Sequence, residues 1–348
     1  MDQMSCRAPD KTRFLKALAR IPYPEISYFE TELSPEIMSR ILEKDINART
    51  YFLEPNELVA LLSAAGIDMA YLCFPWFEGR KWQSDEKGRK HYVDGIIKSR
   101  DDMVKINFPS VDSVKRRTEA FLEAAEGTGI GLVHALNSAN DIITSIGLQD
   151  YYIKLYDDPF FIEEFMDVYE EKVVYPFMET VIGYKPDAVL LGCELCYKDG
   201  MMISPELAEK FVLKRMRRQM EYVRSAGIPA ILHSDGDNTN VMDEWIRMGF
   251  AAIHPLENCC RFDIFEVKKK WGDKITLMGG IDLAGVLISG STREVAADTL
   301  RHLDVLSDGG GYICGSSHDI NEDVPVENLR AMIRTVSGYS RQDDRRIK

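Results

Sequence analysis

Short apolar runs of strand length alternate with longer amphipathic segments from Gly66 to near the C-terminus, a pattern that few folds accommodate. Segments such as SPELAEKFVLKRMRRQMEYVRSAG separate most of the runs and are long enough to connect two parallel strands. Because such units build a parallel sheet covered by helices, eight of them predict a closed (β/α)8 TIM barrel, a fold of the α/β class. The runs lie at 67–74, 103–108, 130–136, 188–195, 229–235, 251–257, 275–282 and 310–317.

Residues 1–65 have a different pattern from the rest of the chain. They contain helix signals, including Ser34 as an N-cap, Pro35 in the first turn of a helix, and Gly66 at the end of another. We therefore expect an N-terminal helical extension over residues 1–65, packed on a barrel formed by residues 66–348. No low-complexity linker separates the two parts.

The segment GRKWQSDEKGRKHYVDGII at 79–97 interrupts the alternation with a polar centre. It predicts a hairpin inserted after the first barrel strand of the pattern. The loops that follow barrel strands build the active-site face, so this hairpin is expected to form a lid or a contact with a second copy of the chain in a homodimer. A solvated hairpin without a function is an equally good interpretation.

Composition and charge exclude several classes of protein. The 43 basic and 56 acidic residues give a formal net charge of −13, which disfavours binding to nucleic acid. No apolar run approaches the roughly 20 residues of a membrane span. The seven cysteines are odd in number and scattered, which indicates reduced thiols rather than a disulfide framework. We expect a cytoplasmic protein that does not bind membranes.

Polar side chains follow several of the expected strands, at the point where each strand ends. In a TIM barrel these carboxyl ends meet at one mouth, where active sites lie. Glu194, Glu257 and Asp282 are therefore candidate catalytic residues. The candidate metal ligands are His233, Asp235, Cys314 and His318.

His233 and Asp235 are two residues apart at a strand end, where side chains at this spacing point the same way. Both could reach one ion, and a Cys or second His from the last strand would complete a set of nitrogen, oxygen and sulfur ligands that zinc accepts. Two other interpretations stay open. Asp235 or Asp237 could cap the helix that follows, and His233 could be a buried histidine bonded to a carbonyl. His134 could also reach the mouth, but a core role is expected for it, and the same two interpretations apply to His254.

The C-terminal half resembles the uroporphyrinogen decarboxylase superfamily. The similarity rests on HSDGDNTNVMDEWIRMGFAAIHPLE, ITLMGGIDLAGVLISGSTREV, GGYICGSSHDINEDVPVENLRAMI and the upstream LLGCELCYKDGMMISPELAEKFVLKRMRR, and covers roughly residues 145–340. It implies a (β/α)8 barrel and one of two activities. One branch decarboxylates uroporphyrinogen without a cofactor, and the other moves methyl groups between a corrinoid protein and a small molecule with the help of zinc.

The decarboxylase branch has an arginine-rich motif near the N-terminus and an aspartate at the end of the first barrel strand. The corresponding region RIPYPEISYFETELSP contains one arginine, Arg20, together with Glu25, Glu30, Glu32 and Glu36. The strand at 67–74 ends in aromatic residues instead of an aspartate. A substrate with many carboxylates would be repelled here, which disfavours the porphyrinogen substrate.

The methyltransferase branch holds zinc with a His-x-Cys pair and a later cysteine. Here Asp235 takes the place of the first cysteine, and His318, or alternatively Cys314, takes the place of the second. Such harder ligands leave zinc a stronger Lewis acid, suited to an ether or alcohol oxygen. The resemblance thus implies a zinc-dependent methyltransferase acting on a small molecule, for example a methoxylated compound.

The cofactor of that reaction is expected to come from another chain. No DxHxxG motif for cobalamin occurs in the sequence, so a corrinoid protein would have to supply it. Glu194, Glu257 or Asp282 would then orient ligands or transfer protons. The alternatives are a metal-free decarboxylase that uses His318 and Asp235, and a non-catalytic barrel that binds a corrinoid or tetrapyrrole.

Overall fold

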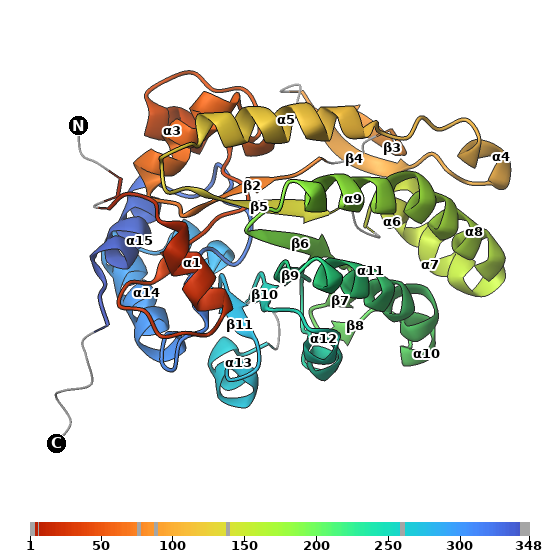
Figure 1. Cartoon of the computed structure of the whole chain (residues 1–348). Coiled ribbons are helices and arrows are strands. Elements are labelled where there is room, and N and C mark those ends of the chain that lie inside the picture. The colour runs from red at the N-terminus through yellow and green to blue at the C-terminus, as the bar shows by residue number, and fades with distance from the viewer. Residues whose placement is uncertain are drawn as a thin grey trace.

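The structure is a computed structural model that describes residues 4–5, 7–74, 78–86, 90–136, 140–257 and 262–341. Eight parallel strands form one curled sheet surrounded by helices, a (β/α)8 barrel (Figure 1). This confirms the predicted fold class. The strands are β1 (Ser27–Tyr28), β2 (Met69–Leu72), β5 (Gly131–Leu136), β6 (Ala188–Gly192), β9 (Ala230–His233), β10 (Ala252–His254), β11 (Thr276–Met278) and β12 (Tyr312–Cys314).

Seven of the eight predicted strands are present, and one prediction is wrong. Residues 103–108 form the end of a short helix and an irregular segment, and the remaining barrel strand is β1. β1 pairs with β12 through Ser27 and Tyr28. The segment expected to be a helical extension therefore contributes a barrel strand. A strand of two residues is too short to show a periodic pattern in the sequence.

The seam between β1 and β2 is joined by Asp68, which precedes β2. Its backbone N–H donates to the carbonyl oxygen of Tyr28 at 3.1 Å, and its side chain accepts from the Ser27 hydroxyl at 2.8 Å. Asp68 is completely buried, and Arg13 of the first helix neutralises it through an ion pair of 2.7 Å. A buried carboxylate is stable only with such partners, so these contacts fix the closure of the sheet.

Helices cover the outside of the sheet, and four further segments have other helical geometry. The predicted helix start at Ser34 and Pro35 is confirmed, because the Ser34 hydroxyl accepts from Ile37 N. The helices are α1 (Lys11–Leu18), α2 (Pro35–Leu42), α3 (Pro55–Ala65), α4 (Arg100–Met103), α5 (Val111–Ala124), α6 (Asn140–Ile146), α7 (Leu148–Asp157), α8 (Pro159–Tyr169), α9 (Tyr175–Gly183), α10 (Pro205–Ala208), α11 (Lys214–Ser225), α12 (Met242–Met248), α13 (Ile264–Trp271), α14 (Thr292–Leu306) and α15 (Val326–Gly338), with the 3₁₀ turn η1 (Thr50–Phe52) and the π-helical segments η2 (Glu170–Val174), η3 (Glu209–Leu213) and η4 (Leu283–Leu287).

Helix α1 closes the end of the barrel at which the strands begin. Its Lys11 N–H donates to the carbonyl of Gly129, just before β5, and the Thr276 hydroxyl at the start of β11 donates to Ala17 O. Phe14 of α1 packs with inward-facing strand residues in an interior core. Its other members are Ala17, Leu18, Phe29, Met69, Val133, Ala188, Leu190, Ile231, Ala252, Met278 and Ile313.

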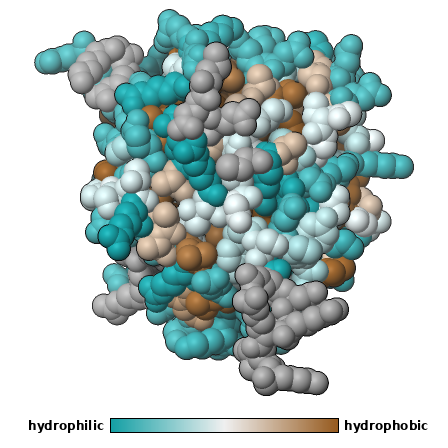
Figure 2. Space-filling model, turned by 90° about the vertical axis from the view of Figure 1, so that its left-hand side faces the viewer, coloured by the Kyte–Doolittle hydropathy of each residue, from teal (hydrophilic) through white to brown (hydrophobic). Residues whose placement is uncertain are grey.

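The left-hand side of Figure 1, where α14 and α15 lie, is shown facing the viewer in Figure 2. On this face apolar residues are scattered between hydrophilic ones.

Since α1 fills the amino end of the barrel, a site for a small molecule is expected at the opposite, carboxyl end. Within the described residues, no helix is both long and apolar enough to span a membrane.

The predicted hairpin is confirmed. Strands β3 (Arg80–Ser84) and β4 (Lys90–Gly95) pair antiparallel after β2, and a second small pair, β7 (Cys196–Tyr197) and β8 (Gly200–Met201), follows β6. The hairpin is anchored on α6, because the Tyr92 hydroxyl donates to Thr144 O at 2.9 Å.

Cys73, Cys193, Cys196 and Cys314 are free thiols, while Cys6, Cys259 and Cys260 lie outside the described residues.

Candidate active site

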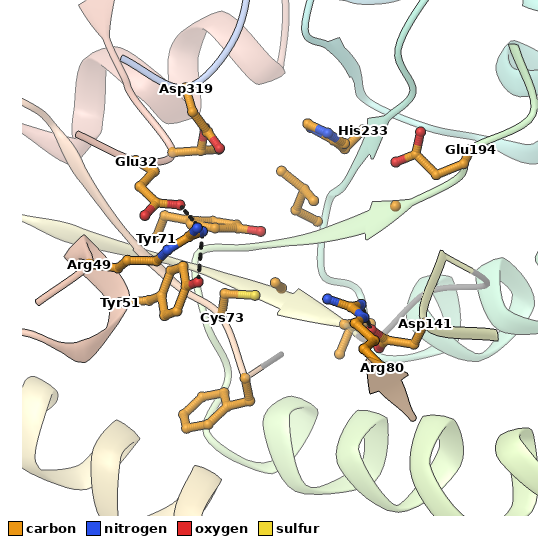
Figure 3. A pocket seen from close by; sticks show the side chains of 16 residues that line it. Glu32, Arg49, Tyr51, Tyr71, Cys73, Arg80, Asp141, Glu194, His233 and Asp319 are labelled. Atoms are coloured by element: carbon orange, nitrogen blue, oxygen red, sulfur yellow. Dashed lines mark hydrogen bonds and ion pairs between the residues drawn. The ribbon is translucent and has the colours of Figure 1, made fainter. Parts of the chain in front are cut away.

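A cavity of about 280 Å³ opens at the carboxyl ends of the strands (Figure 3). Its lining contains both apolar and polar side chains. The predicted candidates Glu194 and His233 belong to this wall, so the rule that strand ends meet at one mouth holds for them. The described residues that line it are Thr31, Glu32, Arg49, Tyr51, Tyr71, Cys73, Phe74, Arg80, Ala135, Leu136, Asp141, Leu190, Gly192, Glu194, His233 and Asp319.

Glu194, His233 and Asp235 form a group that could hold a metal ion. One ligand atom from each lies within 4.8 Å of the others, and within the described part of the chain this is the one such group of three or more. The His233 Nε2 atom is 3.6 Å from Asp235 Oδ1. Two carboxylates and an imidazole from adjacent strands thus face a common point, as expected for His233 and Asp235 from their spacing.

The loop after β9 holds Asp235 in place through Asn238, which is buried. The Asn238 side-chain amide donates to the carbonyl oxygens of Ser234, Asp235 and Gly236 at 3.0–3.2 Å. Its Oδ1 accepts from the Ser234 hydroxyl at 2.9 Å and from Trp245 Nε1 at 3.1 Å. One amide therefore fixes the loop backbone on both sides of Asp235.

Gly236 allows the loop to turn. Its φ of +78° lies in the left-handed region, and a Cβ there would meet the backbone of Tyr197 at 2.6–2.7 Å. The Gly236 N–H donates to the Glu257 carboxylate at 2.8 Å. Glu257, predicted as a catalytic candidate, thus contacts the loop that carries Asp235.

The helix-capping interpretation of the acidic residues does not hold for Asp235. Helix α12 begins at Met242, and its N-cap residue Val241 offers no side-chain bond. Asp237 instead accepts from Thr239 N at 2.9 Å and stabilises a turn. The carboxylate of Asp235 is left facing His233, and its Oδ1 atom is buried without a hydrogen-bond partner.

Burial and neighbouring carboxylates perturb Glu194. Its pKa is raised from 4.5 to about 8, first by loss of solvation and then by the charges of Asp235 and Glu257. Three carboxylates therefore converge on one place. Such an arrangement is costly without a cation or a proton to offset the repulsion, and Asp235 Oδ1 offers an unused acceptor for either.

His254 lies beside the site and was not among the seven candidate site residues. Its Nδ1 is 2.9 Å from His233 Nδ1, and its ring is buried. His134 is instead a core histidine, as expected. Its Nδ1 lies 3.0 Å from Ala135 O, and its Nε2 lies 3.3 Å from the Thr118 hydroxyl. Burial lowers the pKa of His134 to about 4.

The remaining predicted site residues lie elsewhere or at the edge of this group. His318 is half-exposed, with Nε2 at 3.9 Å from Asp235 Oδ2 and Nδ1 accepting from Asp319 N at 2.8 Å. Cys314 does not join the group, because its neighbour Ile313 faces the barrel interior and Cys314 packs in the outer core under the helices. Asp282 accepts from Gly285 N at 3.1 Å as the N-cap of η4.

Several cavity residues were not expected from the sequence. Arg49 directly precedes η1, Arg80 lies in β3, and Asp141 lies in α6. Arg80 forms an ion pair with Asp141, and the Tyr169 hydroxyl also donates to Asp141. These residues come from loops and insertions whose positions depend on the tertiary fold, so the periodic pattern of strands could not reveal them.

Comparison with known proteins places the chain. The family model described as "Uroporphyrinogen decarboxylase (URO-D)" matches residues 135–339, more than half of the sequence. The chain belongs to the URO-D family. The resemblance inferred from the motifs is confirmed, and the matched region contains all seven candidate site residues.

The URO-D relatives are distant. A uroporphyrinogen decarboxylase of Methylococcus capsulatus is 24% identical over 191 residues, 53% of this chain and 51% of the relative. One from Coxiella burnetii is 29% identical over 87 residues, 24% of this chain and 23% of the relative. The alignment thus spans about half the length of the first relative and less of the second.

A solved structure described as a methyltransferase from Methanosarcina mazei has the same fold. It superposes with a TM-score of 0.72 at 15% identity, covering 95% of this chain and 99% of that chain. At this identity the similarity shows the fold alone, over nearly the whole length of both chains. The activity has to be argued from the site.

Proposed function

We propose that this URO-D family member is a zinc-dependent methyltransferase that moves a methyl group between a small molecule and a corrinoid protein. The observation that carries this proposal is the group of Glu194, His233 and Asp235, in which Asp235 Oδ1 is buried without a hydrogen-bond partner. Catalytic zinc sites commonly have three protein ligands from imidazole and carboxylate groups and one position for substrate. The donor set therefore fits zinc.

The charges of the site also fit a divalent cation. Glu194 and Asp235 carry two negative charges when ionised, and the third ligand, His233, can be neutral. A bound zinc ion would act as a Lewis acid toward an oxygen of the small molecule, which favours cleavage of the bond between that oxygen and its methyl carbon. The predicted ligand His318 lies next to this group, within reach of a molecule bound there.

The chain's own residues would supply orientation. His254 holds the ring of His233, Asn238 fixes the backbone around Asp235, and Glu257 holds the turn at Gly236. Ligand geometry that is set before substrate arrives lowers the cost of reaching the reactive arrangement. The cavity supplies space for a small molecule beside these ligands.

A metal-free decarboxylase is the second candidate, because the named relatives are uroporphyrinogen decarboxylases. The cavity wall argues against a substrate with many carboxylates. Among the described residues it contains Glu32, Asp141, Glu194 and Asp319 and two arginines, both of which form ion pairs with carboxylates. Such a wall would repel a polyanion.

A transfer assay tests the proposal. The zinc-loaded protein is mixed with free cob(I)alamin, which stands in for the corrinoid protein, and with a panel of methoxylated compounds, and methylcobalamin is followed by its absorbance. We expect methylcobalamin to form only when zinc is present, and not to form with His233→Ala. The control His91→Ala changes an exposed histidine of the hairpin and should form methylcobalamin like the native protein. Release of carbon dioxide from uroporphyrinogen without methyl transfer would contradict the proposal.

A further inference from the structure

The cavity has a second polar end, across from His233 and Glu194. Figure 3 shows Glu32, Asp319 and Arg49 together on one side of the cavity, with His233 and Glu194 on the other. Glu32 follows β1 and Asp319 follows β12, so two neighbouring strands bring their carboxylates to this end. The proposed function does not use these residues.

Among the described residues, one guanidinium, that of Arg49, faces these two carboxylates. Arg49 Nη1 lies 3.5 Å from Glu32 Oε2 and 3.2 Å from the Tyr51 hydroxyl, and 60% of the Arg49 side chain is exposed, against 14% for Glu32. Asp319 accepts from the Thr31 hydroxyl at 2.6 Å. With both carboxylates ionised, they and the guanidinium carry one net negative charge. The single ion pair is long and largely solvated, so it stabilises the carboxylates little.

The electrostatics of Glu32 reflect this imbalance. Burial, followed by the charge of Asp319, raises the pKa of Glu32 from 4.5 to about 7, although Arg49 and His318 act in the opposite direction. The carboxylate is therefore poorly compensated by its own surroundings. A positive charge brought by a ligand would relieve it.

Outside this acidic end and the group around Glu194, the described part of the cavity wall carries no comparable surplus of charge. Arg80 and Asp141 balance each other in an ion pair. The lining also includes Tyr71, Phe74, Ala135, Leu136 and Leu190, none of which carries a charge. The cavity thus has a metal-binding candidate on one side and an acidic group of residues on the other.

We infer that the small-molecule substrate carries a cationic amine or ammonium group, which binds at Glu32 and Asp319 while the group that gains or loses methyl faces His233. This inference rests on the proposed function only for the identity of the reacting end. A neutral substrate would leave the acidic end uncompensated, and a carboxylate would meet repulsion there. Glu32 and Asp319 are therefore specificity-determining residues, and the substrate class is a small methylated or methoxylated compound with a positively charged nitrogen.

A binding experiment with three probes tests this inference. The probes are 4-methoxybenzylamine, 4-methoxybenzyl alcohol and 4-methoxybenzoate, which share the ring and methoxy group and differ in charge. Their dissociation constants are measured by calorimetry at pH 8, where Glu32 is largely ionised. We expect the amine to bind at least tenfold more tightly than the alcohol, and the benzoate to bind most weakly.

Variants assign the effect to the acidic end. Glu32→Gln and Asp319→Asn should each weaken amine binding about tenfold and leave the alcohol within about twofold, whereas Arg49→Gln should tighten amine binding. The matched control Glu36→Gln changes an exposed glutamate at the start of α2 and should have no effect. Two acidic variants are used so that a folding defect in one leaves the test intact.

The result can be separated from the test of the proposed function, because binding is measured with and without zinc. A preference for the amine in both forms supports the inference even if the protein transfers no methyl group. Equal or tighter binding of the alcohol or benzoate, no measurable binding of the amine at millimolar concentration, or unchanged amine binding in both acidic variants would overturn it.

Discussion

The Nδ1 atom of His233 lies 2.9 Å from the Nδ1 atom of His254, so one of the two nitrogens donates a hydrogen and the other accepts it. Strands β9 and β10 place the two residues directly opposite each other in register. Burial lowers the pKa of His254 well below 6.5, which keeps its ring neutral. If His233 donates from Nδ1, its Nε2 lone pair is free and faces Asp235, as metal binding requires.

Replacing His254 should weaken metal binding without removing a ligand. The variant His254→Phe keeps an aromatic ring at this position but removes the hydrogen-bond partner of His233 Nδ1. The imidazole ring of His233 then loses the contact that orients it. We expect zinc affinity to fall about 10- to 100-fold, measured by competition with a chelator of known affinity. The control is His134→Phe, another buried histidine, which should leave zinc affinity unchanged. Equal losses in both variants would mean that His254 acts only through packing.

The identity of the ligands can be tested by comparing Glu194 with Cys314. Glu194→Gln removes a charged ligand from the group and should lower zinc affinity by at least about tenfold. Cys314→Ser should leave it unchanged, because Cys314 packs in the outer core and burial raises the pKa of its thiol to about 12. Chelator competition on both variants distinguishes them, and the opposite order of effects would restore Cys314 as the ligand.

Asn238 should be important for stability as well as for the site. Asn238→Ala removes three donated hydrogen bonds and leaves the Trp245 indole N–H buried without its partner. We expect the free energy of unfolding to fall by about 3 kcal/mol in urea titrations. Thr239→Ala, an exposed neighbour, should change it by less than about 0.5 kcal/mol. Similar values for the two variants would contradict a clamping role for Asn238.

Stability should depend on pH through Glu30, which is buried and accepts hydrogen bonds from the backbone and hydroxyl of Ser316. Burial raises its pKa from 4.5 to about 7. The folded protein then holds the Glu30 proton more tightly than the unfolded chain does, so this group lowers the free energy of unfolding as pH rises from about 4.5 to 7.

The variant Glu30→Gln isolates this contribution. Between pH 4.5 and pH 8, the free energy of unfolding of the native protein should fall by up to about 3 kcal/mol more than that of the variant. Glu32 and Glu194 contribute equally to the pH dependence of both proteins, so the difference reports on Glu30. Urea unfolding at several pH values measures the difference. Parallel curves for native and variant protein would show that Glu30 has an ordinary pKa.

The barrel was predictable because its strands are buried on both faces and read as apolar runs between amphipathic helices. The exception was β1, whose two residues lie among glutamates and prolines and become a strand only through pairing with β12. The strand predicted at residues 103–108 was wrong for the opposite reason. The short apolar pattern there belongs to the end of a helix and a loop.

The candidate site was predictable only in part. The spacing of His233 and Asp235 placed both at one point, and Glu194 faces the same cavity. His254 could not be assigned, because its role depends on the register between β9 and β10. Cys314 was placed at the mouth as a strand-end residue, but the alternation of side chains along β12 turns it outward. Glu32 and Asp319 meet only because β1 and β12 are neighbours in the closed sheet.

The most direct test of the metal site is zinc content by elemental analysis, on untagged protein purified without chelators. The native chain should hold close to one zinc ion, His233→Ala and Asp235→Ala should hold little, and His91→Ala should match the native chain. A native chain that binds no zinc even after reconstitution, or variants that keep it in full, would contradict a zinc site at Glu194, His233 and Asp235.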